Sequence, residues 1–220
     1  MTTLDAIKLG LTVASGVCWT MVYIEGIRLG LKDRSYAIPF YALALNVAWE
    51  LLHTAFGFQD GVNVQTIINA AWFALDLGIL YTYFKYGRKY FPHNTPARGF
   101  IGWSVVGIVT ALAVEYAFIR EFGVAVGAGY SAFLQNLLMS VLFIDMFVRR
   151  GSDEGQSLYI AVNKWIGTLA PTILYGILGD GGFPRGSFLI LVVGMFCSVF
   201  DLIYVWLLFK FEIARARAAV

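Results

Sequence analysis

The sequence predicts an all-α, polytopic membrane protein that folds as a seven-transmembrane-helix bundle. Of its 220 residues, 59% are hydrophobic, the mean hydropathy is +0.72, and apolar runs recur from one end to the other. Soluble domains contain only about 45–50% apolar residues. Because one helical crossing takes about 20 residues, a chain of this length with short connections holds roughly seven crossings. We therefore expect one membrane domain over residues 1–220.

The predicted spans are separated by short segments that carry charges, Gly and Pro. These residue types end helices and favour turns. In chain order the breaks are Lys32-Asp33-Arg34, Asp60-Gly61, Arg88 through Pro96, Arg120-Glu121, Arg149 through Gln156 and Asp180-Gly181-Gly182. The spans are then expected at residues 6–28, 36–57, 63–85, 98–119, 124–148, 157–178 and 187–209. No small-residue cleavage site follows the first span, which we interpret as structure rather than a signal peptide.

Basic residues are distributed unequally between the two predicted sides of the membrane. One side collects Arg28, Lys32, Arg34, Lys85, Arg88, Lys89, Arg98, Arg149, Arg150, Lys210, Arg215 and Arg217, with Lys164 near the same end of the sixth span. The other side has only Lys8, Arg120 and Arg185. The crowded side is expected to be cytoplasmic, with the N-terminus outside and the C-terminus inside. This mild, loop-clustered charge argues against nucleic acid as a partner.

The second span carries a polar stripe inside an otherwise lipid-soluble segment. Asn46, Glu50, His53 and Thr54 follow i, i+4, i+7 and i+8 spacing, so their side chains project from one face of a helix. An ionisable side chain at membrane depth is costly unless it faces the interior of a bundle. This stripe is therefore the first candidate for a functional site.

Other acidic residues also fall inside predicted spans. Counting the rise per residue as roughly 1.5 Å, Glu50, Asp76 and Asp201 all lie within about one turn of the membrane midplane. We expect these three carboxyl groups to share one cavity. Glu25 and Asp145, in contrast, lie near arginines at the cytoplasmic ends and are expected to form interfacial ion pairs.

Further polar and aromatic side chains accompany the midplane acids. Those expected to bind substrate or support the acids are Asn46, Trp49, His53, Asn69, Trp72, Asp76, Gln135, Asn136 and Tyr204. Several of them also have a structural alternative: Asp76, Gln135 and Asn136 could join helices by hydrogen bonds, while His53 and the tryptophans could be packing residues. Glu115, toward the outer end of the fourth span, has no clear assignment.

A carboxyl group among hydrocarbon and aromatic side chains, with no buried cation to match it, is expected to keep its proton and act as an acid. Aromatic rings around it would stabilise a transient positive charge and exclude water. This combination fits carbocation chemistry, and it fits a small proton-coupled transporter equally well. A carrier usually needs helix breaks at its binding level. Pro171 in the sixth span is the one clear candidate for such a break, and the second, third and seventh spans have none. A closed pocket is therefore favoured over a carrier.

Several other chemistries lack support in the sequence. It contains no zinc-type Cys/His cluster, HExxH, Walker, GxGxxG or GxSxG motif, and no adjacent aspartates. A midplane lysine for a retinal Schiff base is missing from the seventh span, and Lys164 is expected near the cytoplasmic end of the sixth. We therefore expect no metal and no cofactor, and we do not expect a rhodopsin.

The sequence resembles the integral-membrane terpene cyclases of fungal meroterpenoid and indole-diterpene pathways, which also have bacterial relatives. The resemblance covers essentially the whole chain and rests on the seven-span layout, Asn46-x-x-x-Glu50, Trp72-x-x-x-Asp76, the Gln135-Asn136 pair and the late Asp201. It implies that Glu50 and Asp201 are the catalytic residues. Which acid begins the reaction is left open, and we favour Asp201 as proton donor with Glu50 a close rival.

The same resemblance implies the reaction and the surroundings of the enzyme. Family members cyclise a prenyl chain, commonly epoxidised and attached to an aromatic or heterocyclic head group, by protonating an epoxide or an alkene without a metal. The expected partners are thus a lipophilic prenylated small molecule and the lipid bilayer. The location would be the plasma membrane in a bacterium and the endoplasmic reticulum in a fungus, while the head group and the oligomeric state are left open.

Overall fold

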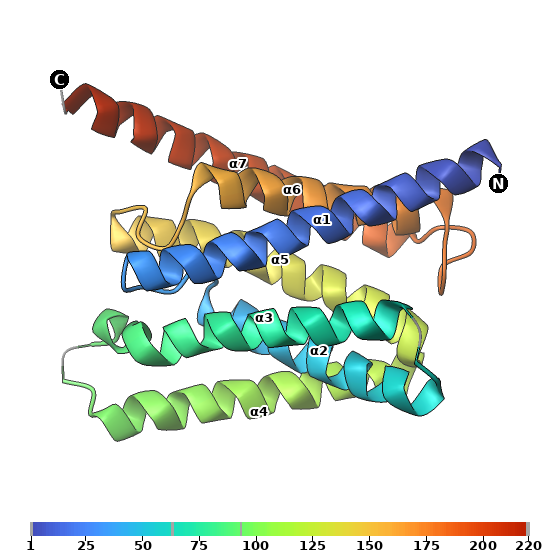
Figure 1. The fold of residues 1–220 in the computed structure, drawn as a ribbon, viewed down its shortest axis with the longest axis horizontal. Helices are drawn as coiled ribbons and strands as arrows, with labels where there is room; N and C mark the ends of the chain where they lie inside the picture. Colours follow the sequence, from blue (N-terminus) through green and yellow to red (C-terminus); the bar gives the residue numbers. More distant parts are fainter. Residues whose placement is uncertain (1, 63, 93, 219–220) are drawn as a thin grey trace.

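The computed structural model describes residues 2–62, 64–92 and 94–218, and in this part of the chain every regular element is helical (Figure 1). The elements are α1 (Thr3–Lys32), α2 (Phe40–Asp60), α3 (Val64–Tyr86), η1 (Gly87–Tyr90), α4 (Ala97–Phe122), α5 (Val124–Arg150), α6 (Leu158–Ile173), η2 (Leu174–Leu178) and α7 (Phe188–Ala218). Each predicted span overlaps one of the seven α-helices, the sixth span also includes η2, and α7 extends nine residues beyond the last predicted span. The prediction of an all-α protein is confirmed.

Five of these helices are long and apolar enough to cross a membrane: α1, α3 with η1 from Thr66 to Tyr90, α4, α5 and α7. The other two fall short for different reasons. The polar stripe lowers the mean hydropathy of α2. The α-helical part of α6 has only 16 residues, and after Pro171 it passes into the π-helical turn η2. Pro lacks a backbone N–H, which removes one hydrogen bond from the α-helical ladder at this point.

Helix α5 lies between two groups of helices (Figure 1). It packs against α2 and α4 on one side, where α2 also contacts α3, and against α7 on the other, where α7 packs against α6 and α6 against α1. A further contact joins α1 to α3. Side chains from α5 can therefore reach both groups, which matters for the polar clusters described below.

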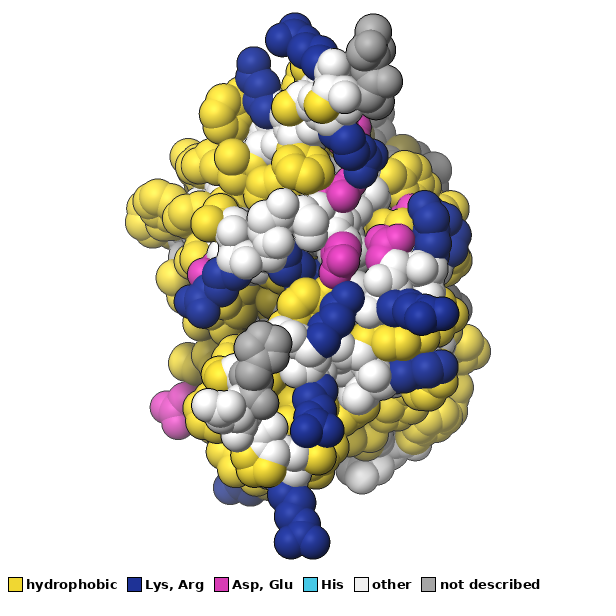
Figure 2. Space-filling model, turned by 90° about the vertical axis from the view of Figure 1, so that its left-hand side faces the viewer, with side chains coloured by type: hydrophobic (Ala, Val, Ile, Leu, Met, Phe, Trp, Pro, Cys, Tyr) yellow, Lys and Arg dark blue, Asp and Glu magenta, His cyan; other side chains and the backbone are white. Residues whose placement is uncertain are grey.

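Lys and Arg side chains gather at the end of the bundle seen in Figure 2, where α1, α3, α5 and α7 finish. Two of the predicted interfacial ion pairs are confirmed there. Arg28 Nε lies 2.6 Å from Glu25 Oε2, and Arg149 Nε lies 2.8 Å from Asp145 Oδ1. Because both pairs join neighbouring turns of one helix at an exposed end, they contribute little to stability.

The connections at this basic end are tied together around Arg150. Its guanidinium lies between the rings of Tyr36 and Tyr90, 4.4 Å and 4.2 Å from their centroids. Glu154 accepts hydrogen bonds from the Tyr90 hydroxyl (2.6 Å) and from Lys89 Nζ (2.9 Å). These two hydrogen bonds, from Tyr90 first, lower the pKa of the Glu154 carboxyl. The segments after α1, α3 and α5 are thereby fixed to one another.

Candidate active site

The polar stripe of α2 faces the interior of the bundle, as predicted. Asn46, Glu50 and His53 expose only 7%, 3% and 7% of their surfaces, and Thr54 is also buried. Lipid-facing positions on the same helix are apolar or aromatic, such as the exposed Tyr41 and Leu51. Helical periodicity is sufficient to produce this separation, because residues three and four apart share one face.

Asn46 joins four helices through hydrogen bonds. Its Nδ2 donates to the Tyr23 hydroxyl of α1 (2.6 Å) and to Asp76 Oδ2 of α3 (2.8 Å). Its Oδ1 accepts a longer hydrogen bond from Gln135 Nε2 of α5 (3.3 Å). We call Tyr23, Asn46, Glu50, Asp76 and Gln135 the Asn46 cluster. The second carboxylate oxygen of Asp76, Oδ1, is buried without a hydrogen-bond partner.

Glu50 lies one helical turn after Asn46 on the same face of α2. Its Oε2 is buried and has no hydrogen-bond partner, and no basic side chain in the described ranges forms an ion pair with it. Asn46, on the same face, donates to Asp76 Oδ2 of α3. A buried carboxyl group in such a place is accommodated best with its proton in place, because an unpaired buried charge is very costly.

Two aromatic side chains adjoin the stripe. The Trp49 indole donates to the Ala128 carbonyl of α5 (3.1 Å) and its ring lies 4.4 Å from that of His53, centroid to centroid. The Trp72 indole donates to Thr20 Oγ1 of α1 (3.0 Å), and its ring lies 6.2 Å from that of Tyr23. These residues keep a structural role alongside any role toward substrate. Asn69, also on the α3 face, is buried.

Asp201 lies in a different environment from Glu50. Lys164 Nζ of α6 is 2.7 Å from its Oδ1 and 2.7 Å from Ser140 Oγ of α5, and Lys164 and Asp201 expose 0% and 1% of their side chains. We call Ser140, Lys164 and Asp201 the Lys164 cluster. The interpretation that left the midplane acids without a matched cation is therefore wrong for Asp201. The long lysine side chain turns inward between α5 and α7 and does not stay at the basic end.

The remaining predicted residues surround the Lys164 cluster. Asn136 Nδ2 donates to Thr168 Oγ1 of α6 (2.7 Å), which in turn donates to the Lys164 carbonyl (3.0 Å). The Tyr204 hydroxyl donates to Gln156 Oε1 (3.0 Å), and its ring packs against Phe143. Asn136 thus has the role of joining helices that was one of its two alternatives.

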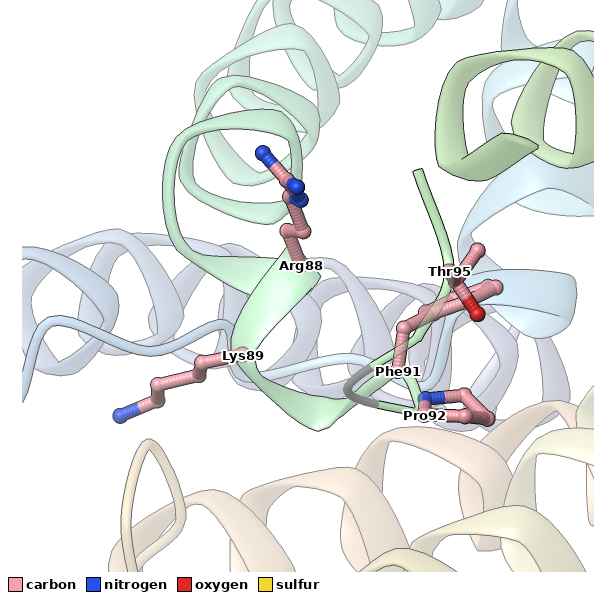
Figure 3. A pocket seen from close by; sticks show the side chains of 5 residues that line it. All are labelled: Arg88, Lys89, Phe91, Pro92 and Thr95. Atoms are coloured by element: carbon pink, nitrogen blue, oxygen red, sulfur yellow. The ribbon is translucent and has the colours of Figure 1, made fainter. Parts of the chain in front are cut away.

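Two surface hollows lie away from both clusters. The larger, about 360 Å³, is lined by Arg88, Lys89, Phe91, Pro92 and Thr95, and Figure 3 shows Arg88 and Lys89 extending in different directions. The other, about 320 Å³, lies between α1 and α6 beside Glu25 and Tyr159. Neither hollow has a predicted site residue in its lining. The chamber expected for an isoprenoid chain stays a prediction.

The described side chains also bear on metal binding. Within residues 2–62, 64–92 and 94–218, no three His, Cys, Asp or Glu residues are grouped closely enough to hold a metal ion. The acids of the Asn46 cluster have amide and phenol neighbours, and the acid of the Lys164 cluster has an ammonium neighbour. The hydrogen-bond partners of Asp76 and Asp201 are therefore an amide and an ammonium group.

The model of the family described as Pyr4-like transmembrane terpene cyclases matches residues 2–213 of the chain. The chain belongs to this family. Curated relatives agree with the match: the Pyr4-family terpene cyclase mfmH of Annulohypoxylon moriforme is 31% identical over 168 residues, which cover 76% of this chain and 69% of that protein. The resemblance stated from the sequence is confirmed.

Two further relatives of the cyclase are more distant. Terpene cyclase macJ of Penicillium terrestre is 28% identical over 196 residues, covering 83% of this chain and 74% of the relative. Terpene cyclase pyr4 of Aspergillus fumigatus is 26% identical over 157 residues, covering 71% of this chain and 65% of the relative. No solved structure matches the chain.

Sequence reasoning missed two partners in the site of the cyclase. Lys164 was grouped with the basic end, although it is the one Lys or Arg between Leu158 and Ile173 and stands four residues before Thr168 on the same face. Tyr23, the partner of Asn46, gives no comparable signal, because a tyrosine in an apolar helix is ordinary. Only the packing of α1 beside α3, which brings the Tyr23 hydroxyl within 2.6 Å of Asn46 Nδ2, reveals its role.

Proposed function

We propose that this cyclase catalyses a proton-initiated, metal-independent cyclisation of a prenyl chain carried on an aromatic or heterocyclic, meroterpenoid-type head group. The observation that carries the proposal is Glu50, a buried carboxyl group with a free oxygen and no ion-pair partner in the described part of the chain. Such a group can hold a proton within a water-poor site and release it to an acceptor that enters the site.

The proposed reaction assigns different tasks to the two predicted catalytic acids. Glu50 transfers its proton to an epoxide oxygen or to an alkene carbon of the bound chain, which generates a carbocation. The π electrons of a neighbouring double bond attack this cation and close a ring. A C–H proton next to the final cation passes to the Asp201 carboxylate, and the product is an isomer of the substrate. This order reverses our initial preference for Asp201 as donor, because Asp201 already pairs with Lys164.

Aromatic side chains near Glu50 support the same chemistry. Trp49 directly precedes Glu50 on α2 and packs against His53, and Trp72 and Tyr23 lie beside Asn46 and Asp76. The faces of such rings attract a cation, and their bulk excludes water that would otherwise capture the intermediate. Much of the remaining rate enhancement comes from binding the flexible prenyl chain in a conformation in which its double bonds are within reaction distance.

We further propose that the cyclase is a single membrane domain in which α2 and α6 cross the bilayer together with the five more apolar helices. Both pack along their length against neighbouring helices, so their polar residues need not meet lipid. The basic end would face the cytoplasm, with the N-terminus outside. The host membrane would be the plasma membrane of a bacterium or the endoplasmic reticulum of a fungus.

The test is a cyclisation assay with the purified protein in nanodiscs, in buffer treated with a chelator. Prenylated aromatic compounds, each offered in epoxidised and plain form, are incubated and the products examined for isomers of unchanged mass. Cyclic isomers from wild type, and none from Glu50→Gln at equal amounts of folded protein, are expected. If no substrate is cyclised while proteoliposomes accumulate a solute in response to a proton gradient, the transporter alternative replaces this proposal.

A second arm in D₂O identifies the protonated atom. Protonation of an alkene places a deuteron on carbon, where it survives work-up and raises the mass of the product. Protonation of an epoxide places it on a hydroxyl oxygen, where it exchanges back. The two substrate forms therefore give distinguishable isotope patterns with the same enzyme preparation.

A further inference from the structure

We propose that Lys164 is a positioning residue that holds Asp201 as a carboxylate, so that Asp201 ends the cyclisation as a base and cannot begin it as an acid. This inference rests on the proposed function for its catalytic consequence. The ionic state of Asp201 can be tested without any turnover. Lys164 touches neither the reacting atoms nor the substrate in this scheme and acts only through its partner.

The contacts of Lys164 fit an ammonium group. An ammonium has three N–H donors and no acceptor. One donates to Asp201 Oδ1 (2.7 Å), a second donates to Ser140 Oγ (2.7 Å), and Nζ lies 5.9 Å from the centroid of the Phe143 ring, within the range of a cation–π contact. At this distance the two opposite charges stabilise each other, and the burial of both side chains leaves each as the other's only ion-pair partner among the described residues.

Ser140 fixes the direction of its hydrogen bond to Lys164. Its hydroxyl donates its single proton to the Asn136 carbonyl one turn earlier on α5 (2.9 Å), so its oxygen is available to Lys164 only as an acceptor. A neutral amine could accept a hydrogen bond only from a protonated Asp201, and it would lose the cation–π contact with Phe143. The charged lysine is therefore the form for which this cluster is built, and Asp201 supplies the opposite charge.

The free oxygen of Asp201 gives this arrangement a catalytic use. Oδ1 is occupied by Lys164, whereas Oδ2 is buried and has no hydrogen-bond partner. Oδ2 can accept a proton from a carbocation, because such a cation is a far stronger acid than any carboxylic acid. The proton balance closes: Glu50 gives one proton to the substrate, Asp201 takes one from it, and Lys164 keeps its own. Exchange with solvent resets the two carboxyl groups before the next turnover.

Isotope-edited infrared spectroscopy tests the ionic state directly. Protein labelled with ¹³C at the side-chain carboxyl of aspartate is compared with equally labelled Asp201→Asn, so that glutamate bands cancel. We expect the difference spectrum to contain carboxylate bands of Asp201 and no band of a protonated carboxyl group. A protonated band assigned to Asp201 would overturn the inference, and with it the role of Asp201 as final base, while leaving initiation of the cyclisation by Glu50 intact. If Asp201→Asn does not fold, Lys164→Met/Asp201→Asn serves as the reference, because it contains no unpaired buried charge.

Kinetics test the dependence of Asp201 on Lys164. Lys164→Met is expected to lower kcat by about 100-fold, the scale of a lost general-base contribution, with little change in KM. In the Asp201→Asn background the same substitution should cause no further loss, because Lys164 acts through Asp201. The exposed Lys210→Met is the matched control and should behave as wild type. Equal losses of kcat in both backgrounds would show a role independent of Asp201 and refute the inference.

Discussion

The Asn46 cluster and the Lys164 cluster both bury carboxyl groups in the same bundle, yet they stabilise them in opposite ways. In the Asn46 cluster, Asp76 is held by a neutral amide, and Glu50 has no ion-pair partner among the described residues. In the Lys164 cluster, Asp201 is held by a cation at 2.7 Å. Neutral neighbours favour a protonated acid, and a cationic neighbour favours a carboxylate.

The contrast teaches how one bundle can hold both a proton donor and a proton acceptor. Environment, rather than residue type, separates the two roles, as it does wherever two carboxyl groups share an active site. Helix α5 is the element that brings the two environments together, because Gln135 and Ser140 lie on it and reach one cluster each. The predictions below test this division, beginning with the largest expected effect.

Glu50→Gln removes the proposed donor and keeps its shape. We expect kcat to fall by about 10²–10⁴-fold, the range for loss of a general acid, while the protein stays folded. The measurement is single-turnover cyclisation in nanodiscs. Glu25→Gln, which alters an acid at the exposed end of α1, is the matched control and should retain activity. If Glu50→Gln turns over substrate as fast as wild type, Glu50 is not the proton donor and the Asn46 cluster has no direct part in the reaction.

Lys164→Met should destabilise the cyclase by about 3–5 kcal/mol, because it leaves the charge of Asp201 buried and unpaired. The free energy of unfolding in detergent, measured by near-UV circular dichroism, reports this loss. Lys164→Met/Asp201→Asn should recover most of it. Arg28→Met, which breaks an exposed pair, is expected to leave the unfolding curve unchanged. A single variant as stable as wild type would mean that the pair is not ionic.

Asn46→Ala tests the neutral cluster in the same way. It removes hydrogen bonds to Tyr23, Asp76 and Gln135, and we expect a loss of about 1–2 kcal/mol, since hydrogen bonds between membrane helices contribute about 0.6 kcal/mol each on average. Asn136→Ala, which removes one such bond to Thr168, is the comparison and should cost less. If the two variants lose equal free energy of unfolding, Asn46 does not stabilise the contact of four helices more than an ordinary interhelical hydrogen bond would.

Substitution of Glu154, which lies outside both clusters, is expected to have the smallest effect on the free energy of unfolding and serves as a reference for the other variants. Because its pKa is lowered in the folded protein, its stabilising contribution is present above the ordinary carboxyl pKa and disappears as the pH falls through the lowered value. Glu154→Gln should cost about 1 kcal/mol at neutral pH, a value kept small by partial exposure. The melting temperatures of wild type and variant should converge in acid, and a constant difference would contradict this assignment.

The fold class and the inward face of α2 could be read from the sequence because they depend on local periodicity and hydropathy. Seven apolar runs with charged breaks correspond to seven helices. Asn46, Glu50 and His53 lie on one face of α2 however the helices pack, because helical geometry alone places them there. The ion pairs of Glu25 and Asp145 could also be predicted from the sequence, because the arginine in each pair lies within four residues of the acid.

Only the tertiary structure decided which acids have which partners. Lys164 and Asp201 are 37 positions apart, and Asn46 and Asp76 are 30 apart, so neither pairing is contained in a helical repeat. The length of a lysine side chain also lets it turn toward the core from a position that resembles an interfacial one. The sequence by itself determined that the polar stripe of α2 is buried, because periodicity is local, and the packing of α5 between its neighbours determined that Lys164 is buried and which charges are matched.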